Sequence, residues 1–226
     1  MQKALLLIIL FSEFSFPRTQ TRNQPDYYSR LNVRNFRKDS LLNQYIDINN
    51  PDYHRLNAAI FFATNEQRLK KKLPLVSYSA KLEELATMHS RDMCEKNFFN
   101  HINPKDRKKR NPGDRARLVG IKNPYIAENI ATAFGLQYEE NRNVIPRGPG
   151  KFSYTSNGEL IQPQTYIAVA DLLLELWMNS EGHRKNILSA NALQLGCGTW
   201  MFFDDKFNQM PTFKATQNFQ EYEKIN

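Results

Sequence analysis

The sequence predicts an α+β fold in which helices cover a central, mainly antiparallel sheet. Three segments with helical periodicity come first along the chain, and two strand-like segments follow each other near its end. Because consecutive strands joined by a short polar turn pair antiparallel, this order is typical of α+β domains rather than of parallel α/β domains. The length of 226 residues suits one domain with extensions, since domains have about 100–200 residues.

The N-terminal segment has the pattern of an export signal. Lys3 precedes an unbroken apolar run over residues 4–11. This run is much shorter than the ~20 residues of a transmembrane helix, so we expect a signal peptide over residues 1–21 and no transmembrane span. No A-x-A cleavage site follows the run, and an uncleaved anchor is the alternative. Export implies a secreted or periplasmic protein.

Residues 22–50 predict an N-terminal extension that lies on the domain. The segment is polar and rich in asparagine and arginine, and Pro51 marks its end. The main domain is therefore expected over residues 51–226. The extension carries one apolar patch, formed by Leu41, Leu42, Tyr45 and Ile46.

Helical periodicity predicts three helices. The first covers residues 53–72 and is stopped by Pro74; the second follows Ser79, a residue suited to an N-cap, and ends near Asn97. The third covers residues 166–178, with Trp177 expected in the core. The apolar stripe of the second helix consists of Leu82, Leu85, Ala86, His89 and Met93.

Turn residues and alternation predict the rest of the fold. A turn-rich loop with a short helical piece at residues 114–119 precedes a strand or extended segment at 125–134. Residues 136–164 form an expected insertion, in which Asn157-Gly158 predicts a hairpin turn. The last strands cover residues 193–203 and 213–220. Alternation in the final strand, at Phe213, Ala215, Gln217 and Phe219, predicts a half-buried strand.

The net charge of +8 is concentrated at residues 70–72 and 105–117. Neither basic run carries interleaved aromatic residues or a nucleic-acid-binding motif, so we interpret both as solvated loops and expect no nucleic-acid partner. Anionic surface glycans or lipid head groups are the alternative partners of these runs.

The chain has two cysteines, Cys94 and Cys197. Neither belongs to a C-x-x-C pair, which argues against redox catalysis and against a zinc knuckle. We expect two buried thiols that pack as small apolar groups. A disulfide between them, which an oxidising compartment permits, is the less favoured alternative.

Three residues stand out as candidates for a site. His101 and His183 fall in turn-like segments, and Glu128 lies in the otherwise apolar stretch IAENIA. A buried carboxylate is costly unless it is paired or near solvent. By contrast, His89 lies on an apolar stripe and is interpreted as a core histidine, and His54 opens a helix and is expected to be exposed.

The order of short motifs resembles the CAP superfamily, the SCP-like family of cysteine-rich secretory, antigen-5 and pathogenesis-related-1 proteins, in its bacterial form. The motifs are MHSRDM followed by FFNHINP, then AENIA, LELWMNSEGHRKNIL, LGCG and TQNF. The resemblance covers about residues 52–219, and W-x-x-S-x-G-H-R-x-N-I-L is long and specific. It implies an αβα sandwich with a concave cleft lined by two histidines and acidic residues.

The resemblance also implies which residues line the cleft. His101 matches the first cleft histidine, Glu128 matches the acid of the G-E-N motif, and His183 matches the histidine of G-H. Ala127 stands where that motif has glycine. The candidates for a fourth cleft residue are Ser180, which occupies the position of the second acid, and the nearby Glu181 and Glu175.

Two imidazoles and a carboxylate can hold Zn²⁺ or another divalent metal. The chain has no H-E-x-x-H or G-x-S-x-G motif, and we assign no catalytic residue. We therefore expect a secreted, monomeric, non-enzymatic protein that binds a divalent metal or another ligand in this cleft. The alternatives are a metal-dependent hydrolase that uses the same cleft and a structural interaction module with an idle cleft. The ligand stays open between a small molecule, a lipid and a surface glycan.

Overall fold

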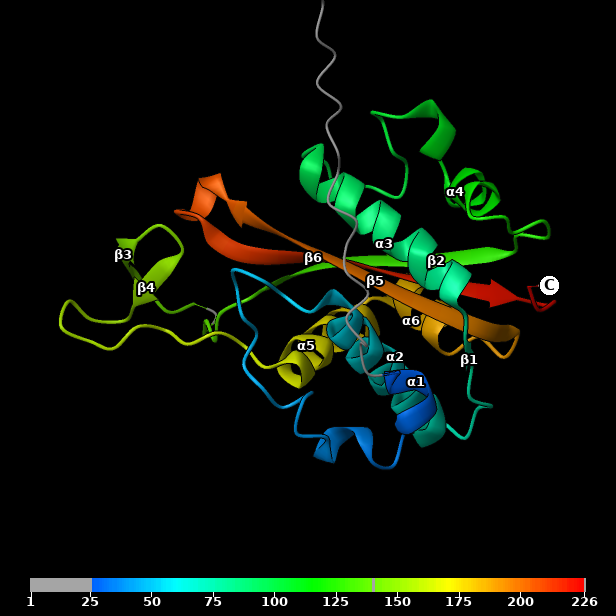
Figure 1. Cartoon of the computed structure of the whole chain (residues 1–226), viewed down its shortest axis with the longest axis horizontal. Helices are drawn as coiled ribbons and strands as arrows, with labels where there is room; N and C mark the ends of the chain where they lie inside the picture. The colour runs from blue at the N-terminus through cyan, green and yellow to red at the C-terminus, as the bar shows by residue number, and fades with distance from the viewer. Residues whose placement is uncertain (1–25, 140, 226) are drawn as a thin grey trace, which may run out of the picture.

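A four-stranded sheet lies between two layers of helices in the computed structural model, which describes residues 26–139 and 141–225 (Figure 1). In spatial order the strands are β1 (Ser77–Tyr78), β5 (Ala192–Asp204), β6 (Met210–Glu221) and β2 (Ile126–Phe134). β1 is parallel to β5, and β6 is antiparallel to both of its neighbours, β5 and β2. The short parallel strand β1 was not predicted.

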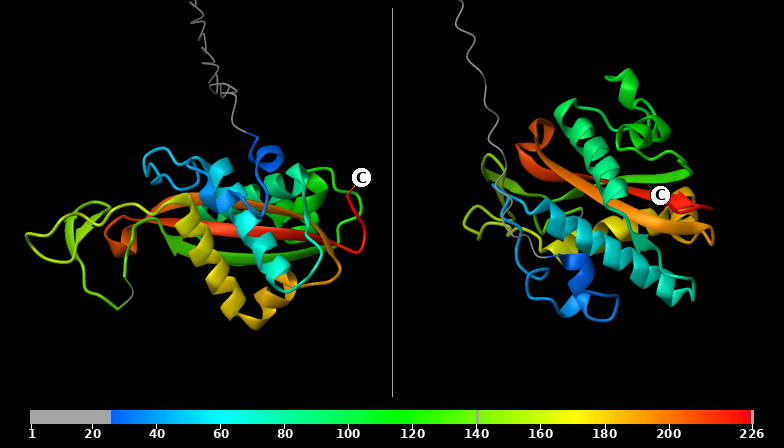
Figure 2. Two further views of the ribbon diagram at one scale, coloured as in Figure 1. Left: turned by 90° about the horizontal axis from the view of Figure 1, so that it is seen from below. Right: turned by 45° about the vertical axis from the view of Figure 1, so that its right-hand side comes forward.

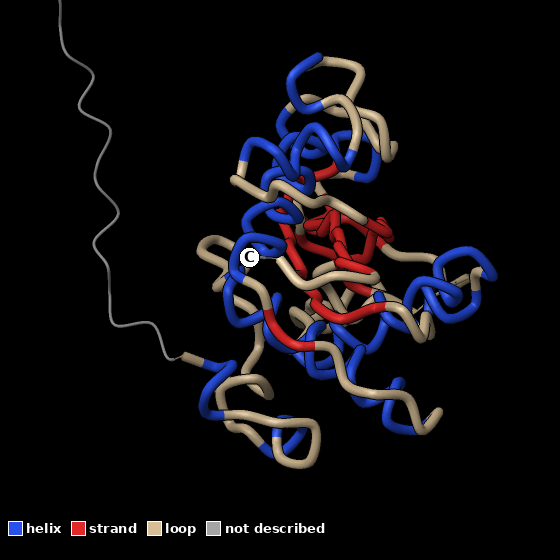
Figure 3. Tube along the Cα trace, turned by 90° about the vertical axis from the view of Figure 1, so that its right-hand side faces the viewer, coloured by secondary structure: helices blue, strands red, loops and turns tan. Residues whose placement is uncertain are grey.

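Each face of the sheet is covered by helices, with the strands in the middle layer (Figures 1 and 3). One layer contains α3 (Ala80–Glu95) and α4 (Pro112–Leu118). The other contains α2 (Tyr53–Lys70), α5 (Tyr166–Asn179) and α6 (Glu181–Ile187). This arrangement confirms the α+β class and the αβα sandwich. The remaining short elements are α1 (Tyr27–Arg30), η1 (Phe36–Lys38), η2 (Arg107–Lys109) and η3 (Asp205–Phe207).

Local sequence explains where the helices begin. The Ser79 hydroxyl accepts a hydrogen bond from the backbone N–H of Leu82 at 3.4 Å, so Ser79 is the predicted N-cap of α3. Asn111 and Asp114 form a reciprocal capping box at the start of α4. Helix α6 was not predicted. The chain is extended at Ser180 and turns helical again directly after it, so His183 lies in a helix and not in a turn.

Strand β6 is buried on both faces, from Met210 to Gln220. The prediction of a half-buried strand is therefore wrong, because helices cover both faces of the sheet. Several buried polar side chains on β6 find partners in the helical layers, whereas the side-chain amide of Asn218 has none within the described residues. Two such side chains belong to Thr216 and Gln217. The hydroxyl of Thr216 lies 2.8 Å from that of Ser90 in α3, and the side-chain amide of Gln217 donates to the hydroxyl of Thr64 in α2 at 2.7 Å.

Two glycines of β5 allow α3 to approach the sheet closely. A Cβ atom at Gly196 would overlap the α3 backbone at Leu82 and Glu83, and one at Gly198 would overlap it at Ala86 and Thr87. The LGCG motif is thus the place where helix and sheet backbones come into contact.

The insertion at residues 136–164 contains a hairpin that projects from one end of the sheet (Figure 2). Its strands are β3 (Ile145–Gly148) and β4 (Lys151–Ser153). The chain reverses between these strands, where Gly148 and Gly150 adopt positive φ angles of 137° and 66° that other residues rarely adopt. A second reversal includes the predicted turn at Asn157-Gly158: the backbone N–H of Gly158 donates to the carbonyl oxygen of Thr155 at 3.1 Å, and that of Ile161 donates to Phe152 of β4 at 2.8 Å.

The segment before Pro51 contributes to the main core rather than only lying on it. The Arg37 guanidinium donates to Glu66 of α2 at 2.6 and 2.8 Å and to Asp171 of α5 at 2.9 Å, which ties the segment to both helices. Tyr45, from the predicted apolar patch, is exposed instead. The core members from this segment are Tyr27, Leu31, Phe36, Leu42 and Ile46.

Both cysteines are free thiols. Cys197 is buried as predicted, whereas Cys94 is only half-buried, and its thiol lies 3.4 Å from the carbonyl oxygen of Trp200. Burial raises the pKa of Cys94 to about 12 and that of Cys197 well above its ordinary value. Neither thiol is therefore an activated nucleophile.

Residues 26–139 and 141–225 include no helix with the length and apolarity needed to cross a bilayer. The expected signal peptide, residues 1–21, lies outside the described residues.

Candidate functional site

His101, Glu128 and His183 come together at β2, the strand at one edge of the sheet. His101 lies in the loop after α3, Glu128 lies on β2, and His183 lies on α6. Because α3 and α6 are on opposite faces of the sheet, the two histidines reach this edge from different helical layers. The structure thus brings all three predicted residues to one place.

Glu128 is the buried centre of the cluster, with a side chain 2% exposed. One carboxylate oxygen lies 3.0 Å from Nδ1 of His101, and the other accepts a hydrogen bond from Nη2 of Arg115 at 2.7 Å. Burial alone would raise the pKa of Glu128, but the hydrogen bond to His101 and the charge of Arg115 hold it below its ordinary value. Glu128 is therefore a charged group whose oxygens are already engaged.

Arg115 is a fully buried cation that the sequence did not reveal. Besides Glu128, its guanidinium donates to the backbone carbonyls of His101 at 3.1 Å, Lys109 at 3.1 Å and Arg110 at 3.3 Å. The prediction that the whole basic run 105–117 is solvated is wrong for this residue, because Arg115 folds inward to neutralise Glu128. Basic residues of the run that are exposed as predicted are Lys105, Arg107, Lys108, Arg110 and Arg117.

His89 is a core histidine, as predicted, and it also borders the cluster. It is fully buried, its Nε2 lies 3.0 Å from the carbonyl oxygen of Asn100, and the same nitrogen lies 3.8 Å from Glu128. Burial lowers the pKa of His89 to about 4, so the ring is neutral at neutral pH. Nε2 then carries the proton and donates a hydrogen bond to the carbonyl oxygen of Asn100, which holds the loop leading to His101.

Two asparagines hold the backbone of α6 against β2. The side-chain amide of Asn129 donates to the carbonyl oxygen of His183 at 3.1 Å. The amide of Asn186 donates to the side-chain oxygen of Asn129 at 2.8 Å. Both residues stand in the quoted motifs AENIA and GHRKNIL, which was the signal that could have identified them as positioning residues.

The two imidazole rings are separated by 6.4 Å between centroids. A Zn–N bond of about 2.1 Å puts each ring centroid about 3.2 Å from the metal, so two ligating rings lie at most about 6.4 Å apart and about 5 Å apart in tetrahedral geometry. A shared ion therefore requires the two rings to approach each other by about 1 Å. Because Glu128 engages Nδ1 of His101, Nε2 is the nitrogen left for a metal.

The described residues contain no group of three histidine, cysteine, aspartate or glutamate side chains arranged to hold a metal ion. A metal at the histidine pair would therefore have two protein ligands, with water or another ligand completing its coordination. Burial, and secondly the nearby His101, lower the pKa of His183, which keeps the imidazole in the neutral form that binds metals. Of the two roles considered for Glu128, its contacts favour that of acceptor for His101 over that of third ligand.

The candidates for a fourth cleft residue do not join the cluster. Glu181 and Glu175 are exposed, and Glu181 pairs with Lys185 at 2.7 Å. Ser180 is half-buried at the junction of α5 and α6, and its hydroxyl makes no hydrogen bond to His183 within residues 26–139 and 141–225.

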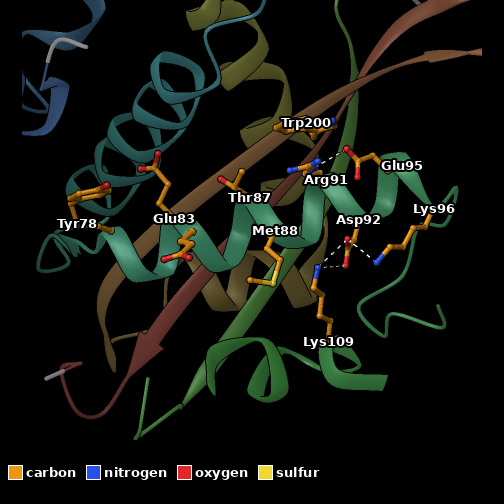
Figure 4. Close-up of a pocket in the computed structure, with 12 residues that line it drawn as sticks. Tyr78, Glu83, Thr87, Met88, Arg91, Asp92, Glu95, Lys96, Lys109 and Trp200 are labelled. Atoms are coloured by element: carbon orange, nitrogen blue, oxygen red, sulfur yellow. Dashed lines mark hydrogen bonds and ion pairs between the residues drawn. The ribbon is translucent and has the colours of Figure 1, made fainter. Parts of the chain in front are cut away.

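Another groove, with a volume of about 770 Å³, lies elsewhere, along the outer face of α3 (Figure 4). One of its walls is Trp200, which is covered by Tyr53 on one side, at 4.6 Å between ring centroids, and contacted by the Arg91 guanidinium at 5.1 Å. The Trp200 ring of this groove thus contacts neighbouring side chains, and none of the predicted site residues lines the groove. The charged pairs of the groove along α3 are Arg91 with Glu95, and Asp92 with Lys96 and Lys109.

Comparison with known proteins gives one family and several relatives. The family model described as CAP, the cysteine-rich secretory protein family, matches residues 61–207, which include the three cluster residues. The uncharacterized protein YkwD of Bacillus subtilis is 30% identical over 135 residues, which are 60% of this chain and 38% of that protein.

Solved structures give a similar result. An extracellular protein with an SCP domain from Bacillus anthracis has a TM-score of 0.50 and 27% identity, covering 75% of this chain and 41% of that one. An outer surface protein of Borrelia burgdorferi has a TM-score of 0.45 and 12% identity, covering 72% and 90% of the two chains. This chain thus spans well under half the length of both Bacillus relatives.

Proposed function

The chain belongs to the CAP family of cysteine-rich secretory proteins, and on that premise we propose that it is a secreted protein that binds a divalent transition metal ion between His101 and His183. Zn²⁺ is the ion that best suits two imidazoles and an open coordination sphere. The apolar run at residues 4–11 supports export, as does the description of the Bacillus anthracis relative as extracellular.

The observation that carries the proposal is the arrangement of the histidine pair. Two imidazoles from opposite helical layers face each other at 6.4 Å, and a buried carboxylate engages Nδ1 of His101 and so leaves its Nε2 for the ion. An orienting carboxylate of this kind is the usual partner of a metal-ligating histidine. When bound, the ion supplies a Lewis-acidic centre with positions open to a further ligand.

Binding suits the site better than catalysis. The described residues include no activated nucleophile, since both cysteine thiols have raised pKa values and the Ser180 hydroxyl makes no hydrogen bond to His183. The carboxylate of Glu128 is engaged by Arg115 and His101, so it is not free to act as a general base.

Calorimetric titration of the purified protein with Zn²⁺ tests the proposal. We expect one ion per chain, bound more weakly than in four-ligand structural zinc sites because only two protein ligands are present. The double variant His101→Ala/His183→Ala should lose binding, while His54→Ala, which removes a histidine far from the cluster, should keep it. Equal zinc binding by the double variant and the wild type, or none by either, would exclude the proposed site.

A further inference from the structure

Beside His183, the edge of β2 and the end of α5 border a hollow of about 270 Å³. Its apolar lining comes from three parts of the chain: the loop after α3, strand β2 and helix α5. His183 therefore borders both the proposed metal position and this hollow. The residues that matter here are Phe99, Ile130, Leu176 and Trp177 on the apolar side, together with Ser180 and His183.

We propose that the hollow receives the apolar part of the ligand of this site, and that the ligand is a carboxylate with a compact aromatic or branched aliphatic group. The carboxylate meets the ion at the histidine pair, so this part of the inference rests on the proposed function. The apolar group fills the hollow, and this part of the inference depends only on the residues that line the hollow.

The size of the hollow selects a compact group. A cavity of about 150 Å³ lined by apolar side chains is large enough to bind benzene. A hollow of about 270 Å³ therefore accepts a phenyl or branched group with a short linker, whereas a long acyl chain would extend beyond it.

Two side chains of the lining are unusually exposed for their type. Phe99 is 49% exposed and Leu176 is 41% exposed, and they come from opposite helical layers yet border the same hollow. A single exposed apolar residue is ordinary, but apolar side chains gathered around a concavity are typical of a ligand site. A compact apolar group placed between them would remove both from water.

The charge of the site favours an anion. Glu128 carries the negative charge of the cluster, and the guanidinium of Arg115 neutralises it at 2.7 Å. A divalent ion held by two neutral imidazoles keeps its full positive charge, and an anionic donor is the group that compensates it.

The test is an NMR titration of the ¹⁵N-labelled full chain, with and without Zn²⁺, using acetate, 3-methylbutanoate, phenylacetate and decanoate. Burial of each additional methylene equivalent strengthens binding about fourfold. We therefore expect phenylacetate to bind at least tenfold more tightly than acetate. Decanoate should gain nothing over phenylacetate, since its chain exceeds the hollow.

Leu176→Gln is the decisive variant, because its exposed position allows the change without loss of folding. It should remove most of the preference for phenylacetate and leave zinc affinity unchanged. Leu69→Gln is the matched control, since Leu69 is similarly exposed, at 47%, near the end of α2.

The outcomes separate this inference from the proposed function. A failure to bind zinc rejects the metal site alone, and the hollow is then judged by phenylacetate binding to the metal-free chain. The inference is overturned if phenylacetate binds no more tightly than acetate under both conditions. Equal effects of Leu176→Gln and Leu69→Gln, or a steady gain up to decanoate, also overturn it.

Discussion

Glu128 and Arg115 form the buried ion pair on which the candidate site depends. Both side chains are at most 2% exposed, and they are joined by a 2.7 Å hydrogen bond. Removing one partner of such a pair leaves the other charge buried and unpaired. This lowers the free energy of unfolding by far more than the pair itself contributes.

Glu128→Gln should therefore lower the free energy of unfolding by on the order of 3 kcal/mol. It should also weaken zinc binding by about 10- to 100-fold, as changes to residues that orient a metal ligand do. Urea denaturation and calorimetry measure the two effects. Glu175→Gln, at an exposed position, serves as the control and should change neither. If the two variants were equally stable, the buried pair would have no energetic role.

His54 is a second residue whose environment differs from its sequence prediction. It was expected to be exposed, but its side chain is only 26% exposed, and its Nδ1 lies 3.0 Å from the carboxylate of Glu83. The same carboxylate accepts a 2.6 Å hydrogen bond from the Tyr28 hydroxyl. The hydrogen bond to Glu83 raises the pKa of His54 despite partial burial, and the charges of Asp52 and Asp26 add to this effect.

The raised pKa of His54 makes stability depend on pH. The native state binds the proton more tightly than the unfolded state, whose histidine pKa is about 6.5. The contribution is fully present below about pH 6.5 and is lost as the pH rises through the raised native pKa. The difference in unfolding free energy between wild type and His54→Gln should therefore be larger at pH 6 than at pH 9. A difference that does not change between these pH values would contradict the assignment.

At the scale of elements, the contact between α3 and β5 positions the candidate site. His89 lies on α3, and the loop that follows α3 carries His101. The helix reaches this position because Gly196 and Gly198 leave room for its backbone. An error in this contact would shift His101 away from Glu128.

Gly198→Ala should destabilise the fold by about 3 kcal/mol or more, because the new Cβ would overlap the α3 backbone and the helix would have to move away. Gly182→Ala is the matched control. Gly182 lies in α6 with open space around its Cβ position, so alanine there should add up to about 1 kcal/mol through helix propensity. Thermal unfolding of both variants compares them. Similar melting temperatures would mean that α3 does not approach β5 this closely.

On the scale of the whole molecule, the N-terminal segment belongs to the same folding unit as the matched domain. Its buried side chains enter the core between the sheet, α2 and α5, and Arg37 bridges carboxylates of these two helices. The family match begins only at residue 61, so this packing adds to what the family comparison covers.

Phe36→Ala should cost about 3–5 kcal/mol, as truncations of buried aromatic residues do, because Phe36 is fully buried against the core. Tyr45→Ala, in the same segment but 60% exposed, should stay within about 0.5 kcal/mol of wild type. Chemical denaturation measures both changes. A small effect of Phe36→Ala would instead describe a segment that is dispensable for folding.

Patterns that act over a few residues could be predicted from the sequence. The stripe that includes His89, the cap at Ser79 and the two final strands were predicted, because periodicity and capping depend on neighbours within a turn or two. The reversal between β3 and β4 and the break at Ser180 were not predicted. In both places glycines or polar residues permit several turn positions, and packing against the rest of the chain selects one.

The sequence by itself determined the three long helices, the three long strands, their order and, through its motifs, the family and the three candidate residues. Only the tertiary structure decided that Arg115 leaves its basic run to neutralise Glu128, that both faces of β6 are buried, and that His101 and His183 meet at 6.4 Å. The physical reason is the separation along the sequence over which each interaction acts. Hydrogen bonding and side-chain periodicity within a helix or strand depend on adjacent residues, whereas a buried charge finds its partner only when packed elements bring distant parts of the chain together.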